Sequence, residues 1–128
     1  MKEKVKAKWE KALTDLELIS AGDEVQESVM ANWLEITAKI FGTWVKGEMV
    51  FTKQRLVFVS TFAASSFSLR YSDIKEIEKC NISWFFPMGI IIEAVDPETG
   101  KEKSYRCSVS KRAKWIAYLS EKTGISCS

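Results

Sequence analysis

Apolar side chains recur at helical spacing near the start of the chain and then change to the alternating spacing of β-strands. Val5, Trp9, Ala12, Leu13 and Leu16 form one apolar stripe of a helix predicted over residues 3–14, and lysines take the other face. After residue 23, short segments rich in Val, Ile, Phe, Trp and Thr alternate with turn residues. This pattern predicts an N-terminal amphipathic helix followed by an antiparallel β-fold.

The alternation places strands between clear turn signals. Lys53-Gln54 forms the turn of the clearest hairpin, Asp96 to Gly100 forms another turn, and Gly42 and Gly47 interrupt the early strands. Charges crowd the segment 74–78, which predicts a charged edge strand. The predicted strands cover residues 24–34, 40–45, 49–52, 55–59, 67–71, 74–78, 89–95 and 101–109.

One last helix follows the strands. Ser110 is its expected N-cap, Trp115, Ile116 and Leu119 form its apolar stripe, and Gly124 suits its C-terminal end. The predicted fold class is mainly β (α+β): a partly open barrel of about seven antiparallel strands, capped by this helix. We expect a helix at residues 1–16, a barrel domain at 17–124 and a tail at 125–128.

Composition narrows the function classes. The 128 residues are 46% apolar and carry 19 basic and 17 acidic groups, a net charge of +2, which fits one globular domain and is too mild for a nucleic-acid footprint. No histidine is present, so the usual general base and zinc ligand are missing, and Cys107 is best explained as a core residue. We therefore expect no catalysis, no cofactor and no metal.

The chain also lacks sequence signals for secretion and for a membrane span. The N-terminal segment is rich in lysine without an apolar stretch, and the longest uncharged runs fall short of the ~20 residues that cross a bilayer. Three widely spaced cysteines do not suggest a disulfide framework. These features predict a cytoplasmic protein without a transmembrane segment.

Two segments resemble a known family. Residues 47–58 contain Gly47, alternating apolar residues, then Thr52, a turn, Arg55-Leu56 and Phe58, while residues 73–77 read Asp-Ile-Lys-Glu-Ile. Over residues 17–122 this order resembles the GRAM domains of the pleckstrin-homology-like superfold. The resemblance implies a non-catalytic intracellular module that binds lipid or protein, with Thr52, Arg55, Phe58 and Asp73 as residues that support the fold. Only Lys39 and Lys46 lie near the position of the basic cluster of inositide-binding pleckstrin-homology domains, which argues against specific phosphoinositide recognition.

Three consecutive aromatic residues, Trp84, Phe85 and Phe86, precede Pro87. Consecutive side chains of one strand cannot all point into a core, so these rings either fold over the barrel mouth or form an exposed contact loop.

Two functions from different classes follow. The first is peripheral association with anionic membrane lipid, through Trp84, Phe85 and Phe86 and through basic residues such as Lys53, Arg70 or Arg112. The second is protein interaction or self-association, through the charged edge strand or the helix that carries Trp9. We expect the apolar stripe of that helix to pack on the barrel through Val5, Trp9, Leu13 and Leu16; the alternatives are that it lies on a membrane or contacts a second copy.

Overall fold

The computed structural model describes residues 2–36, 42–61, 65–80 and 88–127, which form seven strands and two α-helices. A single 3-10 turn, η1 (Tyr71–Asp73), joins the fourth and fifth strands. The larger elements are α1 (Glu3–Asp15), β1 (Val25–Ile36), β2 (Gly42–Thr52), β3 (Arg55–Ser60), β4 (Ser66–Arg70), β5 (Ile74–Cys80), β6 (Gly89–Val95), β7 (Glu102–Val109) and α2 (Arg112–Thr123).

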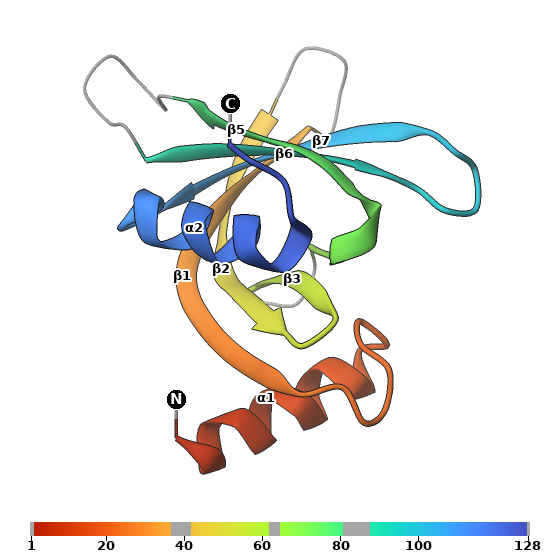
Figure 1. The fold of residues 1–128 in the computed structure, drawn as a ribbon. Coiled ribbons are helices and arrows are strands. Elements are labelled where there is room, and N and C mark those ends of the chain that lie inside the picture. Colours follow the sequence, from red (N-terminus) through yellow and green to blue (C-terminus); the bar gives the residue numbers. More distant parts are fainter. Residues whose placement is uncertain (1, 37–41, 62–64, 81–87, 128) are drawn as a thin grey trace.

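The seven strands form one antiparallel sheet that curls into a partly open barrel (Figure 1). Its strand order is β4-β3-β2-β1-β7-β6-β5, so β4 and β5 are the two edges. The long strand β1 joins the two halves, because it pairs with β2 along its length and with β7 at Ala31 to Trp33. The predicted fold class is confirmed, and so is the prediction that residues 74–78 lie in an edge strand.

The core lies inside the barrel and beneath α2. Strand alternation sends Phe51, Phe58 and Ile92 inward, where all three are fully buried. Trp115 of α2 stacks on Phe51, with ring centres 5.1 Å apart and planes 7° apart. This stack anchors α2 on the barrel.

The N-terminal helix packs on the outer face of the barrel, away from β5 and β6 (Figure 1). Leu13 is fully buried there in a second cluster with Val50, Val57 and Val59, and Trp9 packs against its rim. The prediction that this helix docks on the barrel is confirmed for Trp9 and Leu13. Val5 and Leu16 are exposed instead.

Two boundaries differ from the sequence-based expectation. The predicted strands 40–45 and 49–52 are one strand, β2, which runs through Gly47 without interruption. Gly47 pairs with Ser60 of β3, and a side chain at Gly47 would collide with the β3 backbone, so its role is close packing rather than a break. Ser110 is not the N-cap of α2: Lys111 holds that position in a left-handed conformation, and no side chain caps the helix there.

Candidate functional site

The residues predicted as a contact site are dispersed over the fold. Trp84, Phe85 and Phe86 lie outside the described residues. Lys53 is exposed in the turn between β2 and β3, whereas Trp9 is half-buried on α1.

Both candidate arginines already have partners. The Nε of Arg70 donates to Oδ2 of Asp73 at 3.0 Å, so Asp73 and Arg70 form an ion pair at the end of β4. Nη1 of Arg112 donates to the carbonyl oxygens of Cys80 at 2.9 Å and Gly89 at 3.4 Å. Arg112 therefore ties the start of α2 to the adjoining ends of β5 and β6, and both guanidinium groups already bond to oxygen atoms of the protein.

The resemblance motif forms a polar network that is buried at Thr52 and Asp23 and half-buried at Arg55. Thr52 Oγ1 donates to Oδ2 of Asp23 at 2.7 Å and accepts from the backbone N–H of Arg55 at 2.8 Å. Nη1 of Arg55 donates to Oγ of Ser68, which in turn donates to the carbonyl oxygen of Leu18. These bonds join β2, β3 and β4 to the segment after α1, which agrees with a role in supporting the fold.

A cavity of about 500 Å³ lies between the β6–β7 hairpin and β4. Lys101 and Lys103 line it together with three carboxylates, those of Asp73, Asp96 and Glu102. The Lys103 ammonium already lies 5.2 Å from the centre of the Tyr105 ring, within cation–π range. Because acidic groups outnumber basic ones, this cavity does not favour an anionic headgroup.

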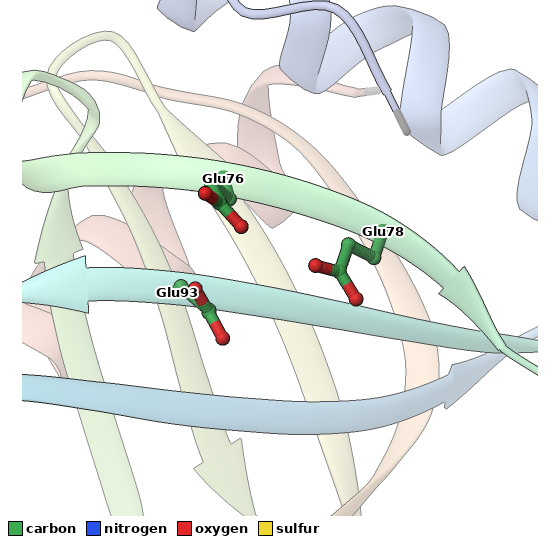
Figure 2. A group of neighbouring side chains, drawn as sticks. All are labelled: Glu76, Glu78 and Glu93. Atoms are coloured by element: carbon green, nitrogen blue, oxygen red, sulfur yellow. The ribbon is translucent and has the colours of Figure 1, made fainter.

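Three carboxylates gather on the outer face of β5 and β6 (Figure 2). Glu76 and Glu78 share that face two residues apart, and Glu93 of β6 lies opposite Glu76 in the strand register. Their oxygens lie within 4.8 Å of one another, which could hold a cation. Calcium takes six to eight oxygen ligands, however, and exposed acidic groups are common on proteins without a bound ion, so these three carboxylates do not by themselves indicate a metal site.

The described residues show no activated nucleophile at Cys107. Its side chain is fully buried, and burial, with a smaller contribution from nearby Cys80, raises the pKa of the thiol to about 12. The thiol therefore stays protonated at neutral pH, as a packing residue would. This agrees with the sequence interpretation of Cys107 as core.

Large apolar side chains are exposed on another part of the surface. Met30 is 60% exposed, Leu16 44%, and Val5 and Trp44 41% each. Met30 and Trp44 point outward from β1 and β2 on the same side of the sheet that α1 covers further along. The sequence analysis missed these two residues, although the alternation of Trp44, Lys46 and Glu48 with inward residues carried the signal.

Comparisons with known proteins identify the fold. No protein-family model and no curated protein matches the sequence. Among solved structures, the C-terminal domain of an unknown protein from Leishmania infantum is 24% identical, with a TM-score of 0.68 over 91% of this chain and 95% of that one. The Vps36 N-terminal PH domain is 15% identical, with a TM-score of 0.58 over 84% of this chain and 83% of that one.

The Slm1 PH domain in complex with inositol 4-phosphate is 11% identical, with a TM-score of 0.53 over 77% of this chain and 94% of that one. At these identities the likeness concerns the arrangement of the backbone. Together with the strand order and the capping helix, it shows that the chain has the pleckstrin-homology-like fold.

Proposed function

We propose that this chain is a non-catalytic binding module, similar to GRAM domains, that associates peripherally with membranes containing anionic lipid. The observation that carries the proposal is the match of its fold to a PH domain in complex with inositol 4-phosphate. The exposed lysines and apolar side chains of the described surface supply the two interactions that such association needs. None of the helices in the described part of the chain is long and apolar enough to cross a membrane.

The geometry favours charge-dependent binding with little selectivity among headgroups. Specific recognition of a phosphate usually employs several arginine forks, and Arg70, Arg112 and Arg55 each bond to protein atoms. The remaining arginine, Arg106, is a single exposed side chain on β7. Exposed lysines act as point charges that attract any anionic surface. Each lysine near such a surface contributes about 1 kcal/mol, and salt weakens this attraction.

Sedimentation with lipid vesicles tests this function. We expect the protein to pellet with vesicles that contain phosphatidylserine, to remain in the supernatant with pure phosphatidylcholine, and to be released by added salt. Vesicles that contain phosphatidylinositol 4-phosphate, matched in total charge, should bind about as well as phosphatidylserine vesicles. Failure to pellet with either anionic vesicle at low salt would refute the proposal and favour the protein-interaction class.

A further inference from the structure

Four large apolar side chains are exposed, which we call the apolar face: Val5 and Leu16 of α1, Met30 of β1 and Trp44 of β2. Leu16 and Met30 line one groove, and Trp44 lies further along the same outer face of the sheet, beyond Lys46 and Glu48. The four are the large apolar side chains with the greatest exposure in the described part of the chain. Large apolar groups gathered on one side of a soluble domain mark a contact surface.

Strand register and helix spacing explain why these residues share a side. Met30 pairs with Glu48 and Leu34 pairs with Trp44, so alternate residues of β1 and β2 point outward together. The outward-pointing side chains of β2 form a row that continues along the strand to Val50, which α1 covers. Because the docked helix covers the row at Val50 while Met30 and Trp44 remain exposed, the uncovered part of the row lies beside the helix.

A groove of about 390 Å³ joins the helix to this row. Trp9, Ala12 and Leu16 line its helix side, and Met30 and Lys46 line its sheet side. Val5 continues the helix side of the groove, since residues 5, 9, 12 and 16 follow one stripe of an α-helix. The apolar face is therefore continuous from α1 to β1.

The charges at the start of α1, beside Val5, are mainly positive, whereas Asp15 and Glu17 flank Leu16 at its end. Residues 2–8 contain four lysines, at positions 2, 4, 6 and 8, and one acidic residue, Glu3. Lys46 adds another exposed ammonium on the sheet side of the groove. The acidic residues Glu10 and Asp15 line a separate depression with Asp23 and Glu24.

We infer that the apolar face, flanked by the lysines of α1 and by Lys46, is the surface that this protein lays on an anionic membrane. This inference rests on the proposed function and adds to it the orientation of the bound domain. Val5, Leu16, Met30 and Trp44 enter the interfacial region of the bilayer, while the lysines contact lipid phosphates and carboxylates. Among the described residues that line the groove, Glu48 is the one carboxylate, and partial burial raises its pKa. Lys46, two residues away on the same face of β2, offsets its negative charge.

The charges favour a membrane over a second copy of the chain. A twofold dimer that sets the lysine-rich starts of two α1 helices against each other would bring like charges together. Like charges in such an interface oppose association, whereas an anionic bilayer complements them.

The test compares vesicle binding of surface variants. We expect Met30→Ser/Trp44→Ser to lower the partition coefficient on phosphatidylserine vesicles by about tenfold or more, because two large apolar side chains leave the interface. Lys4→Gln/Lys8→Gln should lower it by about fivefold for each lysine, which is ~1 kcal/mol converted at 1.4 kcal/mol per tenfold. Melting curves and circular dichroism verify that each variant is folded.

Three matched controls locate the contact surface. Ile91→Ser/Val95→Ser removes two half-buried apolar side chains from the outer face of β6, and Lys101→Gln/Lys103→Gln removes two lysines at the β6–β7 hairpin. Trp84→Ser/Phe86→Ser tests the aromatic segment named by the sequence. We expect all three controls to bind vesicles like the unmodified protein.

The outcomes separate the orientation from the function. If the unmodified protein binds vesicles and the apolar-face variants bind equally well, the orientation is wrong and the function stands. If only Lys101→Gln/Lys103→Gln or only Trp84→Ser/Phe86→Ser loses binding, the orientation is also wrong and the function stands. If the unmodified protein does not bind, both proposals are refuted. A dimer detected by light scattering that Met30→Ser/Trp44→Ser dissociates would assign the apolar face to a second copy and overturn the inference.

Discussion

Replacing Trp115 with alanine is expected to lower the free energy of unfolding by about 3–5 kcal/mol, the usual cost of removing a buried tryptophan. Trp115 is 4% exposed and stacks on Phe51, so its removal leaves a cavity where α2 meets the barrel. Domains of this size are stable by only about 5–15 kcal/mol. Thermal unfolding should therefore shift downward by roughly 10–20 °C.

A control on the same helix isolates the packing effect. Glu121 is exposed on α2, and Glu121→Ala should change stability by less than about 0.5 kcal/mol. If Trp115→Ala fails to fold, Trp115→Phe should show an intermediate loss, since a smaller ring still covers part of Phe51. A Trp115→Ala protein with the same melting temperature as the unmodified protein would contradict the role of the Trp115–Phe51 stack in anchoring α2.

The second large effect is expected at Gly47, where the smallest addition to the chain should destabilise the sheet. A Cβ atom at Gly47 would collide with the carbonyl oxygen of Val59 and lie 2.8 Å from Cα of Ser60. Both obstacles belong to the backbone of β3, so no side-chain rotation relieves them. Gly47→Ala should therefore cost about 3 kcal/mol, at the upper end of overpacking.

Chemical denaturation measures this cost against a matched change. Ser66→Thr adds one methyl group at an exposed position of β4 and should leave stability nearly unaltered. Equal midpoints for Gly47→Ala and the unmodified protein would show that β2 and β3 do not approach as closely at this position as the structure has them.

Most of the fold follows from local patterns. Alternation located the hairpin around Lys53, the edge strand β5 and the β6–β7 turn, where Gly100 takes the expected left-handed conformation. Gly47 misled the sequence analysis, because a glycine that ends a strand and a glycine that packs against a neighbouring strand look alike until the neighbour is known. Lys111 at the start of α2 was missed for a similar reason, since a serine beside it is a typical cap.

The candidate surface was harder to predict than the fold. The helical stripe showed that α1 has an apolar face, but which of its residues dock depends on the outer face of the sheet: Leu13 is buried, whereas Val5 and Leu16 are exposed. Arg70 and Arg112 resembled free basic residues because their partners, Asp73 and the backbone of Cys80 and Gly89, are set by the tertiary fold. Met30 and Trp44 became candidates only once the register placed them on the part of the outer face of the sheet that α1 leaves uncovered.

Methionine methyl signals offer the most direct test of membrane binding through the apolar face. Met30 is 60% exposed on this face, Met49 is fully buried in the core, and Met88 follows the aromatic segment and Pro87 in the sequence. The protein, labelled with carbon-13 at its methionine methyl groups, is measured by NMR while bound to anionic nanodiscs that carry a spin label at the headgroup level. We predict strong broadening of the Met30 signal and a sharp Met49 signal. A bound protein whose Met30 signal stays sharp, or in which only Met88 broadens, would contradict the account.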